Sequence, residues 1–355
     1  MDFLISVGYI AIAILVLLLM ILIHELGHYL VGRWLGFKID EFSIGFGKAI
    51  FQKTNKRGEK ISLRIFPLGG YCLFHGDDEE MGDKERKKEV KTDDPEAFNN
   101  QKPWKRVLVF ISGAAFNFIS AILFAFILLV SYGYDIRQVT ELSSHNIVNQ
   151  NLQVGDVIYA VDDENIDFAF GRTFEQMMSA KAANGATVTL TIRRDGEMIK
   201  EDVTFYKITA GEEEYLVIGA QVKSAPLPFL EALLKCVPFA FGMAWVVLKA
   251  LWMMITFQVG IQDIGGPIAT ISFIATAAQA NFANILFLIP AIAANLAVFN
   301  LLPFPALDGA HVVFTGIEWV RKKPVPRNVE AQIHFWGLMA LLAFVVVVDV
   351  LHFVL

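Results

Sequence analysis

Long apolar stretches constrain this chain more than any other feature of its sequence. Four of them, each about as long as a membrane-spanning helix, cover residues 3–23, 107–130, 282–307 and 335–355. A helix of roughly 20 apolar residues crosses the hydrocarbon core of a bilayer, and only helices or closed barrels satisfy their backbone groups there. We therefore expect a polytopic α-helical membrane protein with about four transmembrane helices, surrounded by the lipid bilayer.

A fifth apolar stretch, residues 237–257, contains Pro238, Gly242 and Lys249. Because these residues interrupt the apolar pattern, we expect an amphipathic helix at the membrane interface or a segment that re-enters the membrane. A fifth membrane crossing is the less favoured alternative.

The composition agrees with a membrane protein and excludes one class of partner. Apolar residues make up 55% of the sequence and charged residues 19%, which is below the usual quarter. The formal net charge of −6 offers no basic surface, so we expect no nucleic-acid partner. No sequence feature indicates an oligomeric state.

Basic residues near the ends of the apolar stretches predict their orientation, because Lys and Arg are retained on the cytoplasmic side. Arg33 and Lys38 follow the first stretch, Lys105 and Arg106 precede the second, and further basic residues separate the third from the fourth. With four spans, both termini and the long segment between the second and third spans face outward. The ends of the first and third spans then face the cytoplasm.

The segment between the first two spans has two parts. Residues 50–68 alternate apolar and polar side chains around Lys56-Arg57-Gly58, a pattern typical of a β-hairpin. Gly69 and Gly70 then bend the chain within an apolar stretch. Residues 75–96 are dense in charged side chains, so we expect a solvated linker there.

Residues 132–228 are the one segment that is expected to form a soluble domain. Thr187–Arg193 and Ile199–Tyr206 alternate as two strands around the turn Asp195-Gly196. The order of elements and the stretch Leu152-x-x-Gly155-Asp156-x-Ile158 resemble a PDZ domain. An α+β PDZ-like extracytoplasmic domain is therefore expected, and such a fold binds extended chain ends by strand addition.

The strongest chemical signal is the motif His24-Glu25-Leu26-Gly27-His28 at the end of the first apolar stretch. Residues four apart lie on one face of a helix, so the imidazoles of His24 and His28 can bind one zinc ion. Glu25 then lies beside the open coordination position, where a carboxylate can accept a proton from water. Charged groups at membrane depth cost roughly 2.5–3.5 kcal/mol each and are rarely incidental. The alternative is a cluster of polar residues that anchors the helix end.

A catalytic zinc ion usually has three protein ligands, so a third must be found. The third apolar stretch ends in Asn300-Leu301-Leu302-Pro303-Phe304-Pro305-Ala306-Leu307-Asp308-Gly309. By the predicted orientation, this end lies at the same depth as the end of the first span, so Asp308 can meet His24 and His28. His311 is a nearby alternative ligand on the more solvated side of the turn. The alternative for Asp308-Gly309 is a plain loop turn.

Together, the HELGH motif and the downstream NLLPFPALDG motif resemble the site-2 protease family of intramembrane metalloproteases. The chain is closer to the bacterial RseP-type group, whose PDZ domains face the periplasm, and it has room for a single PDZ-like domain. The resemblance covers nearly the whole chain. It includes the shorter motifs Gly45-Phe46-Gly47, Pro67-Leu68-Gly69-Gly70-Tyr71, Gly113-x-x-x-Asn117 and Gly265-Gly266-Pro267.

The resemblance implies a role for each residue of the zinc site. His24, His28 and Asp308 would bind one Zn²⁺ per chain, and Glu25 would be the catalytic general base.

The resemblance also implies substrate-binding residues. Asn300 would hydrogen-bond an unwound substrate backbone, and Asn117 would help to hold the substrate or the site. The bend at Gly69 and Gly70 could offer an edge on which the substrate lies as an added strand. Each asparagine has a structural alternative, because polar side chains within membrane spans often bridge neighbouring helices.

By the same resemblance, the chain is expected to be a zinc metalloendopeptidase of the bacterial plasma (inner) membrane that acts in regulated intramembrane proteolysis. Its partners would be single-pass transmembrane proteins, such as anti-sigma factors or signal-peptide remnants, cut in or near their transmembrane segments. Two other functions stay open. A metal or solute transporter could use the same His and Asp side chains but would need a continuous polar path, and a non-catalytic PDZ scaffold would have no need for Glu25.

The sequence thus divides into eight expected segments, with the zinc site toward the cytoplasmic side. They are a transmembrane helix with the HELGH motif (1–32), a cytoplasmic loop with the β-hairpin and a membrane-reentrant element (33–104), a second transmembrane helix (105–131), the PDZ-like domain (132–228), an interfacial linker (229–280), a third transmembrane helix with the LDG motif (281–309), a cytoplasmic loop (310–334) and a fourth transmembrane helix (335–355).

Overall fold

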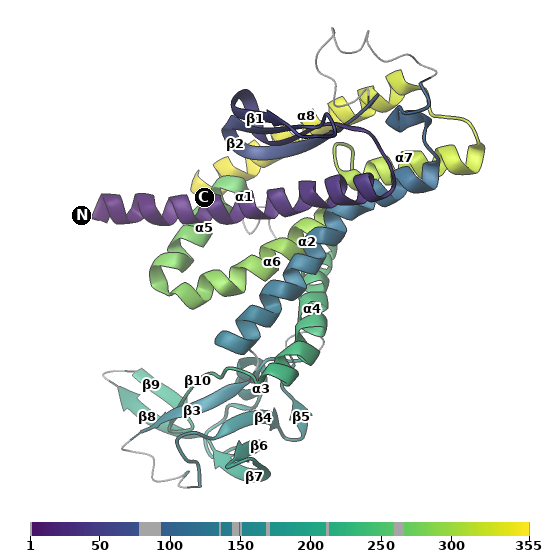
Figure 1. The fold of residues 1–355 in the computed structure, drawn as a ribbon. Coiled ribbons are helices and arrows are strands. Elements are labelled where there is room, and N and C mark those ends of the chain that lie inside the picture. The colour runs from purple at the N-terminus through teal and green to yellow at the C-terminus, as the bar shows by residue number, and fades with distance from the viewer. Residues whose placement is uncertain are drawn as a thin grey trace. The chain divides into compact units, whose positions relative to one another are not determined.

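The computed structural model forms two compact units, shown in Figure 1. The first comprises residues 1–121 and 246–355, and the second comprises residues 122–245. The structure describes residues 2–77, 94–134, 136–143, 149, 151–167, 171–210, 213–258 and 266–354. Most of the linker expected at residues 75–96 lies outside the described residues.

Among the described residues, five helices are long and apolar enough to cross a membrane, one more than the sequence led us to expect. They are α1 (Asp2–Trp34), α2 (Pro103–Ser131), α4 (Phe229–Ile255), α6 (Phe282–Asn300) and α8 (Arg327–Val354). The additional helix is α4, which continues through Pro238. Proline is tolerated within apolar helices that neighbouring groups support, so the interruptions in the sequence pattern did not end this helix.

Two shorter helices occupy segments that were expected to be linker or loop. Helix α5 (Pro267–Ala280) lies within the expected interfacial linker, and α7 (Asp308–Arg321) lies within the expected loop 310–334 apart from its first two residues. At 14 residues, α5 is about 21 Å long and too short to cross the bilayer alone. Asn281 lies between α5 and α6 and caps the N-terminus of α6: its side chain accepts a hydrogen bond from the Ala283 amide at 3.0 Å.

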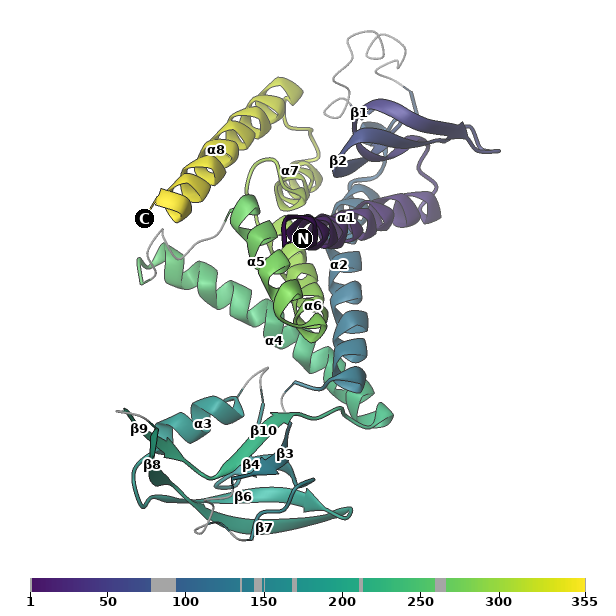
Figure 2. The ribbon, with the colours of Figure 1, turned by 90° about the vertical axis from the view of Figure 1, so that its left-hand side faces the viewer.

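Helices α1, α5 and α6 pack together within the first unit, as Figures 1 and 2 both show. Ala13 of α1, Ile274 of α5 and Leu288 of α6 form a buried apolar cluster there. Gly27 brings α1 close to α2, because a Cβ atom on Gly27 would lie 2.5 Å from the Ser112 carbonyl oxygen. The end of α1 that carries the HELGH motif is therefore held by α2.

An antiparallel strand pair follows α1 and is longer than the hairpin predicted at residues 50–68. Strand β1 (Ile39–Thr54) pairs with β2 (Lys60–Phe74), from Thr54 opposite Lys60 to Ile39 opposite Phe74. The end of the pair at Ile39 and Phe74 packs on the end of α1 and the start of α2 in a buried apolar cluster. The cluster comprises Tyr29, Phe37, Ile39, Phe42, Cys72, Phe74, Phe98 and Val109.

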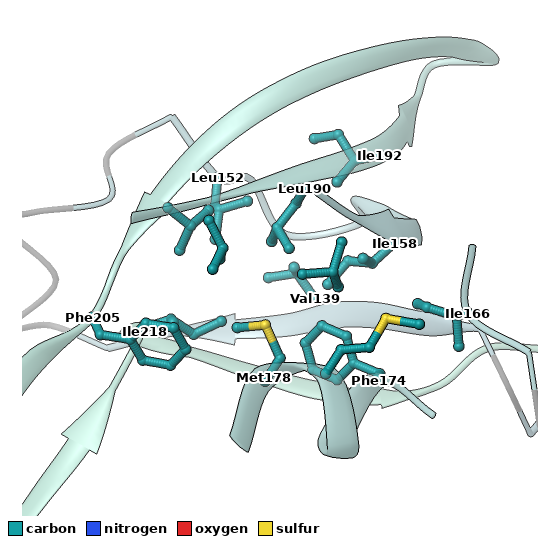
Figure 3. Close-up of a cluster of buried hydrophobic side chains, with 14 residues drawn as sticks. Val139, Leu152, Ile158, Ile166, Phe174, Met178, Leu190, Ile192, Phe205 and Ile218 are labelled. Atoms are coloured by element: carbon teal, nitrogen blue, oxygen red, sulfur yellow. The ribbon is translucent and has the colours of Figure 1, made fainter. Parts of the chain in front are cut away.

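The second unit contains an antiparallel sheet with strand order β10-β3-β4-β6-β7, and a short strand β5 pairs with β4. The strands and the helix of this unit are β3 (Arg137–Leu142), β4 (Val157–Val161), β5 (Glu164–Asn165), α3 (Phe174–Lys181), β6 (Thr187–Arg194), β7 (Glu197–Thr204), β8 (Tyr206–Ala210), β9 (Glu213–Val217) and β10 (Ala220–Ser224). Strands β8 and β9 pair with each other in a separate two-stranded sheet. Figure 3 shows the core of this unit, in which Phe174 and Met178 of α3 face Ile158 and Leu190 of the larger sheet. The class is α+β, and the PDZ assignment stays a prediction.

Candidate metal centre

Helix α1 presents two imidazoles on one face near its C-terminal end. The Nε2 atoms of His24 and His28 lie 3.1 Å apart, as the spacing of four residues predicts. Their ring planes are inclined by 86°, so their in-plane lone pairs can converge on one point.

The carboxylate of Asp308 completes this cluster from a distant part of the chain. Its Oδ2 atom lies 3.1 Å from His24 Nε2 and 3.5 Å from His28 Nε2. Helix α6 ends at Asn300, before the end of the apolar stretch at residue 307, because Pro303 disfavours a helical conformation just before it. The chain then turns tightly to start α7 at Asp308, and a Cβ atom on Gly309 would lie 2.2 Å from the Leu302 carbonyl oxygen. The structure thus brings together the three residues that the sequence analysis expected to meet.

The three ligand atoms fit a zinc ion. Bonds of roughly 2.0–2.1 Å in a tetrahedral site place ligand atoms about 3.3 Å apart, close to the separations between these atoms. Asp308 Oδ2 is buried and accepts no well-oriented hydrogen bond from the described residues. Burial would raise the pKa of the Asp308 carboxyl, but the contacts with His28 and His24 outweigh it and hold the pKa below its ordinary value. An ionised oxygen without a hydrogen-bond donor suits a cation.

The hydrogen bond at His28 favours the protonation state in which Nδ1 carries the proton and Nε2 can bind a metal. Nδ1 of His28 lies 2.8 Å from the Val109 carbonyl oxygen, to which a protonated Nδ1 can donate, and this leaves Nε2 free for a metal. This is the usual arrangement around ligand histidines.

The two asparagines named in the sequence analysis both contact His24. The Nδ2 atoms of Asn117 and Asn300 lie 3.4 Å and 3.3 Å from His24 Nδ1. Rotating a side-chain carboxamide by 180° exchanges the positions of its nitrogen and oxygen. Asn117 Oδ1 is buried with no partner among the described residues. Such a half turn of Asn117 would supply the acceptor that a protonated His24 Nδ1 requires. The asparagines are therefore placed to hold a ligand histidine.

The remaining predicted residues take different positions. Glu25 lines a cavity of about 500 Å³ together with His24, His28 and Asp308. Gly70 also lines this cavity, and a Cβ atom on it would lie 3.1 Å from Cγ of Glu25. Gly69 instead packs against the Phe46 ring, where a Cβ atom would lie 2.1 Å from a ring carbon. Of this glycine pair, the structure brings only Gly70 to the cavity.

A second cluster, His311 with Glu330 and His334, lies in the same unit. The rings of His311 and His334 stack at 4.2 Å with an angle of only 17°, so their in-plane lone pairs run nearly parallel and do not converge on one ion. Burial and the neighbouring His334 lower the pKa of His311 to about 4, which keeps this ring neutral. The ligand atoms of His311 group with those of Glu330 and His334 and not with those of His24, His28 and Asp308, so the alternative zinc ligand is not part of the first cluster. The near-parallel rings make the second cluster a poor fit for a metal.

Sequence reasoning missed Glu330 and His334 because it assigned them to the loop 310–334. Helix α8 begins at Arg327 rather than near residue 335, so both lie on its first turns. Their spacing of four residues was a signal that could have indicated one helix face.

Long apolar helices and a His-His-Asp cluster with an adjacent glutamate are the features that a membrane-embedded metalloprotease requires. A sequence model of Peptidase family M50 matches residues 12–344. The chain belongs to this family, which is the site-2 protease family, and the resemblance is confirmed at that level.

Bacterial proteins match this chain along nearly their whole length. A protein of Mesorhizobium japonicum is 30% identical over 352 residues, covering 93% of this chain and 94% of the relative. One of Clostridium acetobutylicum is 30% identical over 344 residues, covering 96% of both, and one of Agrobacterium fabrum is 28% identical over 358 residues, covering 96% and 94%. Each of the three is named as a candidate zinc metalloprotease.

Proposed function

We propose that this chain is an intramembrane zinc endopeptidase that cuts single-span membrane proteins in or near their transmembrane segments. The observation that carries the proposal is the convergence of His24 Nε2, His28 Nε2 and Asp308 Oδ2 within 3.5 Å of one another. Family membership and the names of the relatives support it. His24, His28 and Asp308 would hold one zinc ion per chain.

Zinc in such a site supplies a Lewis acid that activates water and polarises a peptide carbonyl. Glu25 acts as the general base: its carboxylate accepts a proton from the attacking water and returns it to the leaving amine. Asn117 and Asn300 hold the His24 ring in the orientation that binds metal. The cavity of about 500 Å³ leaves room for a segment of unwound peptide beside Glu25.

The substrate must be extended where it is cut, because the carbonyls of a helix are engaged in hydrogen bonds. Strand β2 passes the cavity at Gly70 and Tyr71. A substrate strand could pair with this part of the β1–β2 pair, which would present its backbone to Glu25. In this arrangement Gly70 admits the substrate, whereas Gly69 shapes the strand through its contact with Phe46.

We infer an RseP-type arrangement in a bacterial inner membrane, with a single PDZ-like domain on the extracytoplasmic side. Helix α4 would cross the membrane inward, and α5, which is too short to span, would return only part of the way. Helix α6 then runs toward the cytoplasm, as the basic residues require. This path reconciles five apolar helices with the orientation predicted for four.

Replacement of Glu25 by Gln tests the proposal and separates it from a transporter or a scaffold. The purified variant should keep stoichiometric zinc and lose cleavage of a model transmembrane substrate by at least about 10²-fold, the lower range for a general base. Glu197→Gln, at the first residue of β7, is the matched control and should keep both zinc and cleavage. Cleavage by Glu25→Gln at the wild-type rate, or wild-type protein without zinc, would overturn the proposal.

A further inference from the structure

Helix α8 contacts the turn that leads to Asp308. The Ala306 amide donates a hydrogen bond to Nδ1 of His334, and the amide nitrogen lies 3.1 Å from Nδ1. Gly337 packs against Pro305 so closely that a Cβ atom on Gly337 would lie 2.2 Å from the Pro305 Cβ. Positions 334 and 337 share one helix face, so two successive residues of the turn are held by one face of α8.

The turn needs support at Ala306. This residue has a φ of 75°, in the left-handed region that is unfavourable for a residue with a Cβ atom. Such conformations persist only where the surroundings hold them. Asp308 follows two residues later, so the conformation of Ala306 determines where the carboxylate lies.

The hydrogen bond to Ala306 defines the state of the His334 ring. Because Nδ1 accepts, it carries no proton, and Nε2 carries the proton of the neutral ring. Nε2 is buried without a partner in the described part of the chain. Among the described residues, the Ala306 amide is thus the hydrogen-bond partner of this imidazole.

Besides the hydrogen bond to Ala306, ring stacking fixes the orientation of the His334 imidazole. His311 lies between two rings, stacked on His334 at 4.2 Å and on Phe110 of α2 at 4.9 Å. Three helices, α2, α7 and α8, therefore contribute to one stack that ends at His334. Its Nδ1 atom is held where the Ala306 amide meets it.

We propose that His334 is a positioning residue: it holds the turn at Ala306 and thereby sets Asp308 for binding the metal. The inference rests on the proposed zinc site and extends that site to helix α8. His334 touches neither the metal nor the reacting atoms in this assignment. It acts through the turn, as groups that orient ligands do.

Two variants of similar shape isolate the hydrogen bond. Asparagine in His334→Asn can place Oδ1 where Nδ1 accepts from Ala306, whereas leucine in His334→Leu has nearly the same branched shape and no acceptor. Both lose the ring stack equally. Gln332→Leu, at an exposed position of the same helix, controls for an added leucine.

Three measurements on the full-length protein in detergent give the readouts. They are Zn²⁺ affinity by competition with a chromophoric chelator, the absorption spectrum of the Co²⁺-substituted protein, and hydrogen exchange of the 303–310 segment in metal-free protein. We expect His334→Leu to lose about 10–100-fold in metal affinity, as for other groups that orient ligands. It should also change the Co²⁺ spectrum and exchange faster at 303–310. His334→Asn should restore all three readouts toward wild type.

The inference is wrong if His334→Leu keeps wild-type affinity and exchange, or if His334→Asn is as impaired as His334→Leu. Both outcomes leave the proposed function intact, because wild-type protein would still bind zinc and cleave. Failure of the wild-type protein to bind zinc would instead overturn the proposed function and this inference together.

Discussion

At the scale of single residues, the proposed metal centre depends on close packing as much as on its proposed ligands. Gly113 of α2 faces the two imidazoles, and a Cβ atom there would lie 2.4 Å from His28 Nε2 and 2.6 Å from His24 Cε1. Both contacts are shorter than real Cβ contacts, so a side chain at this position must displace one of the two imidazoles.

Gly113→Ala should therefore disable the site while the helices still form. A displacement of about 1 Å at a reacting group can cost 10²-fold in rate, and we expect a loss of at least that size, with weaker zinc binding. Cleavage and zinc content measure it. Gly316→Ala on α7 has no atom within 4 Å of its new Cβ and should keep wild-type values. Equal activity of the two variants would show that the centre tolerates a methyl group at 113.

Asn117 offers a second prediction, because it is fully buried beside His24. Asn117→Ala should lower zinc affinity by about 10–100-fold, since it removes a partner of a ligand histidine. Ser120→Ala on the same helix removes a hydroxyl that donates to the Asn117 carbonyl oxygen at 2.7 Å and should bind zinc normally. Lost cleavage with unchanged zinc affinity in Asn117→Ala would assign Asn117 to the substrate instead.

At the scale of elements, the stretch that resembled a PDZ domain has a structural task in the second unit. Asp156 is buried and accepts hydrogen bonds from Nε and Nη2 of Arg194, both at 2.7 Å. It also accepts from the Gln153 amide at 2.8 Å. These bonds tie the turn before β4 to the end of β6.

Asp156→Asn should destabilise the second unit by about 3–5 kcal/mol, the cost of breaking a buried ion pair on one side. Asp163→Asn is the control, because the Asp163–Lys200 pair is 71% and 58% exposed and exposed pairs contribute roughly 0–1 kcal/mol. Hydrogen exchange of the β4 and β6 amides in the full-length protein reports both. Similar protection in both variants would contradict the structural role of Asp156.

At the scale of the whole molecule, the sequence predicted what local patterns encode. Apolar length identified four of the five long helices found among the described residues. The HELGH spacing and the charge pattern predicted that His24, His28 and Asp308 meet. The sequence favoured an interfacial or re-entrant segment for α4 because Pro238 and Lys249 lower the apolar signal, although neither ends the helix and its length suffices to cross a membrane. The spacing of Glu330 and His334 indicates a shared helix face, but the contact of His334 with Ala306, 28 residues away, could not be predicted because no local pattern encodes it.

The proposed membrane path makes a prediction about α4. Lys223, before this helix, should face outward, and Gln258, after it, should face the cytoplasm. In a background without Cys72 and Cys236, a membrane-impermeant maleimide should label Lys223→Cys in spheroplasts, and Gln258→Cys only after permeabilisation. Labelling of both from the same side would mean that α4 does not cross.

The central claim is that His24, His28 and Asp308 bind one zinc ion, and X-ray absorption at the zinc edge of the purified full-length protein tests it most directly. The account predicts one zinc per chain, bound by two imidazoles and by oxygen at roughly 2.0–2.2 Å. The imidazole signal should fall in His28→Ala and the oxygen shell should change in Asp308→Ala. Sulfur ligands, or a signal that neither variant alters, would contradict it.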